Sequence, residues 1–323
     1  MYNLFKLIRI NNLAMIAVTQ YLIRFCVLAP ILHSYKLSLQ MSELWFAMLV
    51  LSTVLIAAGG YAINDYFDTK TDQINRPGRV LVGKTFSRQF AIKLHFALST
   101  AGALLGIATA FYVGEWKLFV IFPLVSAMLW FYSTTFKGQL LIGNIIISAL
   151  TAMVPMMVLI FEAEKIAQAE AAFVNANLIS FNVANYWVAG FALFAFITNF
   201  IREVVKDMED YEGDSETGRV TVPIAWGIKN SQTIVALLAF IEVAFIAVIF
   251  YRHLKWISDP TLFWISLGYV AAALIIPFML LLALILTAKS RKDYTRASFV
   301  IKLLMLSGVL YTVIFYLSYT SLV

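Results

Sequence analysis

Long apolar runs recur along the whole chain and restrict what it can fold into. A membrane-spanning helix needs about 20 mostly apolar residues, and the sequence contains nine such runs. Apolar and polar residues do not alternate within them, as they would in the strands of a membrane barrel, so helices are favoured. We therefore predict an all-α, polytopic membrane protein in a single domain over residues 1–323. The predicted spans lie at roughly 12–33, 42–64, 89–112, 117–134, 142–161, 184–206, 232–252, 261–287 and 298–320.

Composition supports a lipid environment and excludes several other classes. Of the 323 residues, 62% are hydrophobic and 13% are charged, against about 25% charged in a soluble domain. The net charge of +6 reports orientation in a membrane protein, so no nucleic-acid partner is expected. The single cysteine, Cys26, allows no intrachain disulfide, and Arg24 interrupts the first apolar run, so that run is interpreted as a membrane helix and not a signal peptide. No obligate protein partner is evident.

Lysine and arginine are distributed unequally between the connections on the two sides. If the N-terminus is cytoplasmic, the connections on its side are the more basic ones, which fits the positive-inside rule. The connection at 161–183 then lies outside and could form a short surface helix. The basic residues counted on the cytoplasmic side are Lys70, Arg76, Arg79, Lys84, Arg88, Lys137, Arg202, Lys206, Arg219, Lys229, Lys289, Arg291, Lys292 and Arg296.

Two acidic segments follow the second and sixth predicted spans and share the spacing D-x-x-D-x-x-x-D. The first, NDYFDTKTDQINRPGR, covers residues 64–79, and the second, REVVKDMEDYEGD, covers residues 202–214. Residues at i, i+3 and i+7 of a helix lie within about 60° of one another, so each segment presents a carboxylate face. The equal spacing, four spans apart, also suggests an internal duplication.

Carboxylates that cluster at a membrane surface repel one another unless a cation lies among them. Ligands that are all oxygen select Mg²⁺, Mn²⁺ or Ca²⁺, and Mg²⁺ completes its shell with water and phosphate oxygens. Two such clusters with arginine and lysine nearby form a good diphosphate clamp. The candidate carboxylates are Asp65, Asp68 and Asp72 in the first segment and Asp207, Asp210 and Asp214 in the second.

The first segment resembles the N-D-x-x-D-x-x-x-D motif of the UbiA superfamily of intramembrane prenyltransferases, and KDMEDYEGD resembles the second motif of that family. YSTTFKGQLLIGN, from Tyr132 to Asn144, is similar to its Y-S-x-x-x-K segment. The resemblance covers nearly the whole chain. It implies nine helices around a central cavity and a reaction in which Mg²⁺, or Mn²⁺ in its place, binds an isoprenyl diphosphate whose prenyl group passes to a lipophilic acceptor.

The resemblance also implies roles for individual residues. Lys137 and Arg79 would contact the diphosphate, with weaker expectations for Arg76, Tyr132, Arg202 and Lys206. Arg9 and Asn12 take the place of an Arg-x-x-Asn element of the family. Asp65 would support metal binding or the helix geometry. Those expected to hold metal ions are Asn64, Asp68 and Asp72 in one set and Asp207, Asp214 and the nearby Asp210 in the other.

The acceptor is less constrained than the donor. The motifs are most similar to those of the archaeal-type members that transfer a geranylgeranyl group to geranylgeranylglyceryl phosphate. The chain continues RPGRVLVGK where those members often have R-P-[IL]-P, so an aromatic acceptor such as 4-hydroxybenzoate or a quinone precursor stays open. Ion-coupled transporters also place acids in membranes, and CDP-alcohol phospholipid synthases use Asp-rich sites, but their D-G-x-x-A-R pattern is absent from both segments.

Overall fold

The computed structural model describes residues 2–78, 80–169 and 178–320. Within these ranges the chain is helical between its connections, and nine helices are long and apolar enough to cross a membrane, which confirms the predicted class and each predicted span. Two of the spans contain a π-helical segment between two α-helices. The spans are Ile10–Ser34, Glu43–Phe67, Arg88–Val113, Trp116–Thr134, Ile142–Gln168, Asn182–Glu209, Ile228–Leu254, Pro260–Thr287 and Arg291–Thr320.

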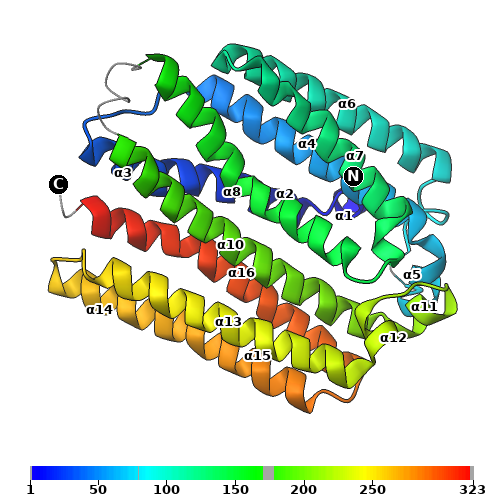
Figure 1. The fold of residues 1–323 in the computed structure, drawn as a ribbon. Coiled ribbons are helices and arrows are strands. Elements are labelled where there is room, and N and C mark those ends of the chain that lie inside the picture. Colours follow the sequence, from blue (N-terminus) through cyan, green and yellow to red (C-terminus); the bar gives the residue numbers. More distant parts are fainter. Residues whose placement is uncertain (1, 79, 170–177, 321–323) are drawn as a thin grey trace.

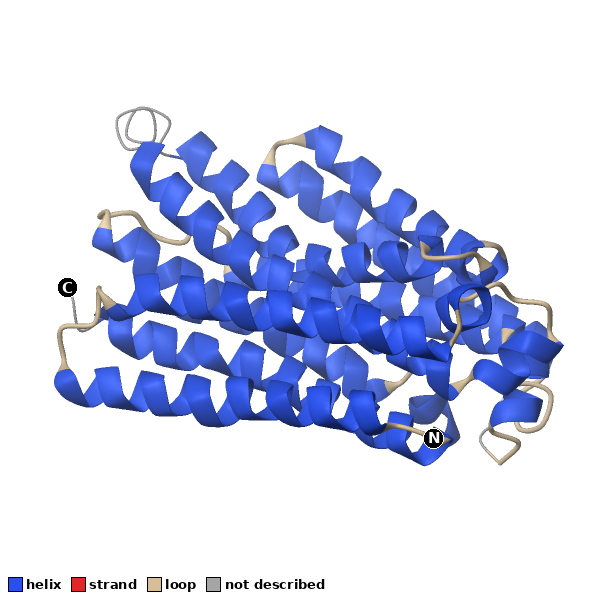
Figure 2. Cartoon of the chain, turned by 60° about the horizontal axis from the view of Figure 1, so that its bottom comes forward, coloured by secondary structure: helices blue, strands red, loops and turns tan. Residues whose placement is uncertain are grey.

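The long helices lie lengthwise against one another in one bundle (Figure 1). The short helices α5, α11 and α12 gather at one end of the bundle, and the C-terminus lies at the other end. Figure 2 shows the same bundle from another side, with short connections between the helices. The bounds are α1 Tyr2–Leu7, α2 Ile10–Leu22, η1 Ile23–Leu28, α3 Ala29–Ser34, α4 Glu43–Phe67, α5 Thr69–Asn75, α6 Arg88–Val113, η2 Trp116–Val120, α7 Ile121–Thr134, η3 Phe136–Gly138, α8 Ile142–Ala169, α10 Leu178–Glu209, α11 Tyr211–Glu216, α12 Val222–Trp226, α13 Ile228–Leu254, α14 Pro260–Tyr269, η4 Val270–Ile275, α15 Ile276–Thr287 and α16 Arg291–Thr320.

The end of the fifth span and the start of the sixth differ from the sequence prediction. Helices α8 and α10 extend to Ala169 and from Leu178, so most of the connection expected at 161–183 is helix; residues 170–177 lie outside the described residues. Alanine, glutamate and lysine dominate the segment after Phe161, and these are good helix formers that let a helix continue beyond an apolar run.

Small residues allow helices α4 and α6 to pack closely against each other. A Cβ atom on Gly102 would lie 2.9 Å from the carbonyl oxygen of Ser52. The Ser52 hydroxyl also donates a hydrogen bond of 2.7 Å to the Gly102 carbonyl. In a membrane, helices associate through such close packing and interhelical hydrogen bonds, because lipid offers no hydrophobic driving force.

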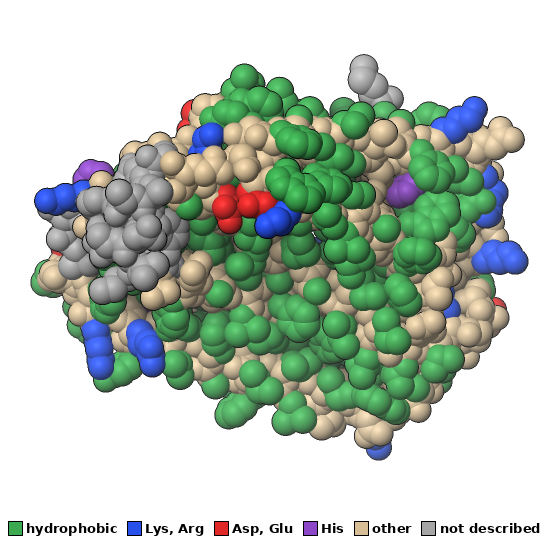
Figure 3. All heavy atoms as spheres, turned by 45° about the horizontal axis from the view of Figure 1, so that its top comes forward, with side chains coloured by type: hydrophobic (Ala, Val, Ile, Leu, Met, Phe, Trp, Pro, Cys, Tyr) green, Lys and Arg blue, Asp and Glu red, His purple; other side chains and the backbone are tan. Residues whose placement is uncertain are grey.

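The surface of the bundle is apolar between its ends. In the face shown in Figure 3, hydrophobic side chains cover most of the area, and the basic side chains lie mainly toward the two ends of the view. Large exposed side chains such as Phe240, Trp264 and Leu286 are 68%, 66% and 63% accessible. A patch of this extent would be a liability in water and is expected where lipid is the solvent.

A buried ion pair stabilises the end of the bundle opposite to α5 and α11. The Arg24 side chain in η1 is 1% exposed, as is that of Glu162 in α8, and the Arg24 Nε lies 3.7 Å from the Glu162 Oε2. The Arg24 guanidinium also donates to the Met41 carbonyl oxygen, and Glu162 accepts from the Met41 backbone N–H at 2.9 Å. The pair therefore fixes the connection between α3 and α4.

Candidate active site

The two Asp-rich segments meet at one end of the bundle. The Asn75 side chain accepts a hydrogen bond of 3.0 Å from the Gly213 backbone N–H and donates one of 3.1 Å to the Asp210 carbonyl oxygen. The hydroxyls of Thr71 and Thr217 lie 3.2 Å apart. Gly213 allows this approach, because a Cβ there would lie 2.4 Å from the Asn75 Nδ2. Helices α5 and α11 are therefore held side by side.

Asp68 is at the centre of the site, at the junction of α4 and α5, and is 5% exposed. Its carboxylate accepts a 2.7 Å hydrogen bond from the Asn64 Nδ2 and one from the Lys137 ammonium. Lys137 also donates to the Asn64 Oδ1 at 3.0 Å. Helix η3 carries Lys137 to Asp68. The Gly138 carbonyl oxygen of this helix accepts a 2.9 Å hydrogen bond from the Val220 backbone N–H. Burial alone would raise the pKa of Asp68, but the adjacent Lys137 and Arg219 hold it well below its usual range.

Arg219 joins the two segments electrostatically. Its Nη2 donates to the Asp68 Oδ1 at 2.7 Å, and its Nη1 donates to the Asp214 Oδ1 at 3.1 Å. Charge counting from the sequence treated Arg219 only as a cytoplasmic cation and gave it no place in the site. The available signal was its position five residues after Asp214, just beyond Gly218, where a turn brings the chain back over α11.

The other predicted metal ligands differ in the hydrogen bonds and ion pairs that their carboxylate oxygens form. Asp207 in α10 accepts a 2.9 Å hydrogen bond from the Asn144 Nδ2 of α8. Asp72 in α5 is half-buried, and within the described chain its carboxylate forms no ion pair or side-chain hydrogen bond. Burial raises the pKa of Asp72, and the charge of Asp68 adds to this effect. Burial also raises the pKa of Asp214, against the opposing charge of Arg219.

Asp65 and Asp210 are engaged in ion pairs at the edge of the site. The Asp65 Oδ1 accepts a 2.8 Å hydrogen bond from the Arg9 guanidinium. The Asp210 Oδ1 lies 2.9 Å from the Arg76 Nη2, which is also 3.1 Å from the Glu209 Oε1. In this arrangement Asp65 orients the start of α2, and Arg76 connects α5 to the end of α10.

The remaining predicted diphosphate residues line a cavity, except for Arg79, which is outside the described residues. Tyr132, Arg202 and Lys206 all line this cavity. The Tyr132 side chain is 7% exposed. Glu203, which the sequence analysis did not single out, also lines the cavity and accepts a hydrogen bond from Arg202.

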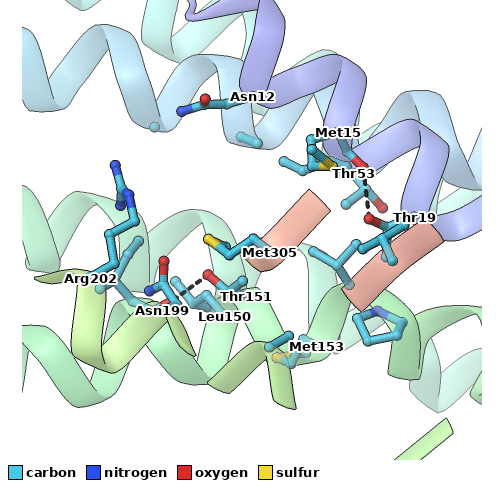
Figure 4. A pocket seen from close by; sticks show the side chains of 18 of the residues that line it. Asn12, Met15, Thr19, Thr53, Leu150, Thr151, Met153, Asn199, Arg202 and Met305 are labelled. Atoms are coloured by element: carbon cyan, nitrogen blue, oxygen red, sulfur yellow. Dashed lines mark hydrogen bonds between the residues drawn. The ribbon is translucent and has the colours of Figure 1, made fainter. Parts of the chain in front are cut away.

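The cavity has a volume of about 460 Å³, and its lining includes Asn64 and Lys206 from the two Asp-rich segments and many apolar side chains of the interior. Its walls come from α2, α4, α7, α8, α10 and α16. In Figure 4, Asn199 and Arg202 of α10 lie across the space from Asn12 and Met15 of α2. A cavity with a polar mouth and an apolar body is suited to an amphiphilic molecule.

The oxygens around Asp68 form a donor set for a hard cation. Asn64 and Asp68 both direct an oxygen at one cation, the Lys137 ammonium, and Asp72 offers free oxygens one turn further along. Carboxylate and amide oxygens are the ligands that Mg²⁺ prefers. Within the described residues no three acidic, histidine or cysteine side chains already converge on one point. Arg219 and Lys137 bond both oxygens of Asp68, and Arg219 bonds one oxygen of Asp214. The residues present fit a divalent cation that competes with these two side chains.

Comparison with known proteins agrees with the fold and the motifs. The model of the UbiA prenyltransferase family matches residues 27–321. The chain belongs to this family. It is 32% identical to a digeranylgeranylglyceryl phosphate synthase of Thermococcus kodakarensis over 263 aligned residues. The aligned region covers 80% of this chain and 82% of the relative. It is 33% identical to the synthase of the same name from Methanopyrus kandleri, over 79% of this chain and 82% of the relative.

Solved structures of UbiA proteins share the fold. A structure of digeranylgeranylglyceryl phosphate synthase covers 97% of this chain and 98% of its own, with a TM-score of 0.62 at 22% identity. A UbiA homologue of Archaeoglobus fulgidus, solved with DMAPP and Mg²⁺, has a TM-score of 0.57 at 17% identity and covers 96% of this chain and 99% of its own. The predicted all-α UbiA fold is thereby confirmed.

Replacing Arg219 tests its role as the link between the two segments. Its side chain is 17% exposed, and those of Asp68 and Asp214 are 7% and 4% exposed. Removing one partner of a fully buried ion pair lowers the free energy of unfolding by about 3–5 kcal/mol. We expect Arg219→Gln to lower it by somewhat less, because Lys137 still faces Asp68. Thermal unfolding in detergent measures this loss. Arg296→Gln, whose arginine is 71% exposed, serves as control, and equal unfolding midpoints for the two variants would contradict the role.

Proposed function

We propose that the protein transfers an isoprenyl group from an isoprenyl diphosphate to a lipophilic acceptor, and that this transfer is a geranylgeranyl transfer to geranylgeranylglyceryl phosphate. The observation that carries the proposal is the junction of an oxygen-rich, cation-binding end with a largely apolar cavity of about 460 Å³. The synthases of that name among the relatives support the choice of acceptor. Family membership favours a transferase over the ion-coupled transporter considered from sequence.

The Asp-rich end would hold the diphosphate of the donor. Asn64, Asp68 and Asp72 on one side and Asp207 and Asp214 on the other would bind Mg²⁺, with Mn²⁺ as a substitute. Held there, divalent ions would supply charge that offsets the diphosphate and makes it a better leaving group. The UbiA homologue of Archaeoglobus fulgidus, solved with DMAPP or GPP together with Mg²⁺, supports this assignment.

Lys137 and Arg219 would change partners when the donor binds. Both cations are paired with Asp68, and they would be available to the diphosphate oxygens if that carboxylate held a divalent ion. There they stabilise the negative charge that grows as the bond to the prenyl carbon breaks. Arg79, the last residue of the first Asp-rich segment, is proposed to stabilise the diphosphate charge in the same way.

The cavity would hold the prenyl chain and exclude water from the reacting carbon. Its body is lined by apolar side chains, among them Ile56, Leu129, Met157 and Phe191. As the C–O bond to the diphosphate breaks, the allylic carbon becomes electrophilic and would react with any water present. The acceptor hydroxyl oxygen forms the new C–O bond, its proton passes to the departing diphosphate, and the protonated diphosphate is released.

The site is proposed to face the cytoplasm, with the N-terminus on the same side. The excess of lysine and arginine in the connections at the end that carries α5 and α11 supports this orientation. Both substrates would then reach the site from the cytoplasmic surface of the bilayer, and the end with Arg24 and Glu162 would face outward.

The proposed metal site predicts that prenyl transfer depends on a divalent cation. A chelator should abolish prenyl transfer, and added Mg²⁺ should restore it. Asp68→Ala and Asp214→Ala should each lower turnover at least about a hundredfold, since losing a ligand or its support commonly costs this much. Product formation from labelled geranylgeranyl diphosphate, identified by mass with geranylgeranylglyceryl phosphate or 4-hydroxybenzoate as acceptor, gives the measurement. Glu216→Ala, an exposed acid two residues beyond Asp214, is the control; near-normal turnover in either Asp variant would refute the metal site.

Lys137→Gln tests the diphosphate contact. Loss of one donor that acts on a developing charge lowers kcat by about 10²–10³, and KM for the prenyl diphosphate should change less, because the contact strengthens toward the transition state. Lys289→Gln, an exposed lysine at the same end of the bundle, should leave both constants near wild type. If the two variants behave alike, Lys137 is only an orientation charge.

Single cysteines test the orientation. In a background with Cys26 replaced by alanine, Gln73→Cys and Ser215→Cys should react with a membrane-impermeant reagent from the cytoplasmic side, and Ser258→Cys from the other side. All three positions are exposed. Labelling of positions 73 and 215 from opposite faces would be incompatible with a shared site, and labelling of both from the outside would invert the proposed topology.

A further inference from the structure

A second group of cations lines the cavity, apart from Lys137 and Arg219, which pair with Asp68. Lys302 of α16 lines the cavity, together with Arg202 of α10 and Arg9 at the start of α2. Lys302 is eleven residues beyond the start of α16 at Arg291, which is about 17 Å along the helix at 1.5 Å per residue. The Lys302 side chain is exposed and lines the cavity, and an ionisable group within a membrane-spanning helix usually marks a functional contact.

Contacts between α10 and α16 place Lys302 beside Arg202. The Thr295 hydroxyl donates to the Glu209 Oε1 at 3.0 Å, and further along a Cβ on Gly308 would lie 2.2 Å from the Phe194 ring. The two helices are therefore antiparallel. Lys302 lies between these contacts and so faces the part of α10 that carries Arg202. Arg202 is five residues before Asp207, about 7.5 Å along the helix from the metal-binding end.

The charges in this group do not cancel. Arg9 is paired with Asp65 and Arg202 with Glu203. Lys302 forms no ion pair or hydrogen bond with the described residues, and three of the four charged groups that act most strongly on it are cations: Arg202, Arg76 and Arg9. The cavity wall at this level has a net positive charge, and a bound anion would offset it.

We propose that Lys302 and Arg202 bind the phosphomonoester of the acceptor, separately from the donor diphosphate at Lys137 and Arg219. This inference rests on the proposed function. The phosphate and the reacting hydroxyl of a glyceryl phosphate belong to one three-carbon unit, so the acceptor phosphate must be held within a few bond lengths of the reaction centre. A cation group about 7.5 Å from Asp207 along α10 meets that requirement. An acceptor without a phosphate would leave Lys302 uncompensated.

The test compares two acceptors in the intact purified protein with Mg²⁺ and geranylgeranyl diphosphate. One acceptor is geranylgeranylglyceryl phosphate, and the other is the same ether with its phosphate removed. In Lys302→Gln, KM for the phosphorylated acceptor should rise at least about tenfold, as loss of a charged hydrogen bond implies. KM for the prenyl diphosphate and the rate with the neutral ether should stay within about twofold of wild type. Lys302→Arg should recover most of the binding, and Lys292→Gln, an exposed lysine near the start of α16, should match wild type.

A measurement on the wild-type protein covers the case in which Lys302→Gln does not fold. Glycerol 1-phosphate should inhibit competitively against the phosphorylated acceptor and not against the prenyl diphosphate. The inference is overturned if Lys302→Gln impairs both acceptors equally, or if KM for the prenyl diphosphate rises in place of that for the acceptor. If the wild type releases diphosphate but prenylates only 4-hydroxybenzoate, the inference and the acceptor assignment both fail, while prenyl transfer stands. If the wild type forms no prenylated product, the proposed function itself fails.

Discussion

Carboxylates that face one another at the edge of a lipid-embedded bundle repel, and the site is organised around what offsets that repulsion. Asp68 and Asp214 are both nearly buried, and Arg219 lies between them. Lys137 approaches Asp68 from the connection between α7 and α8. Two cations from different parts of the chain therefore offset the charge of the carboxylates. In the proposed reaction the same two cations would act on the diphosphate.

The rest of the bundle separates this charged end from an apolar interior. The cavity is enclosed by six helices, while α13, α14 and α15 pack outside it. Lys302, Arg202 and Lys206 line the cavity, while Lys137 and Arg219 pair with Asp68 beside it. Cations are thus present in two groups, which suits a reaction between two amphiphiles with separate anionic groups.

Hydropathy was sufficient to predict the nine spans, because a run of about 20 apolar residues has few alternatives in a membrane. The spacing of the acidic residues was sufficient to predict Asp68 and Asp214 as site residues. It could not show that Asp65 pairs with Arg9, 56 residues away, because an ion pair between distant segments leaves no local pattern. Arg219 was missed for a related reason: counting positive charge treats all cations alike, and only packing shows that this one reaches Asp68 and Asp214. Lys302, inside the ninth predicted span, was not among the cations counted. Their roles, and those of the predicted ligands, remain proposals.

The joint between Asn75 and Gly213 has a consequence for biogenesis. The two residues are 138 positions apart, and chains are synthesised and inserted from the N-terminus. When the first Asp-rich segment emerges, its partner segment and Arg219 do not yet exist. A nascent chain with only its first five helices in the membrane has half of the acidic cluster and no joint to hold it. The reactive centre is therefore completed late in synthesis, and a truncated product would contain lipid-binding helices but no assembled site.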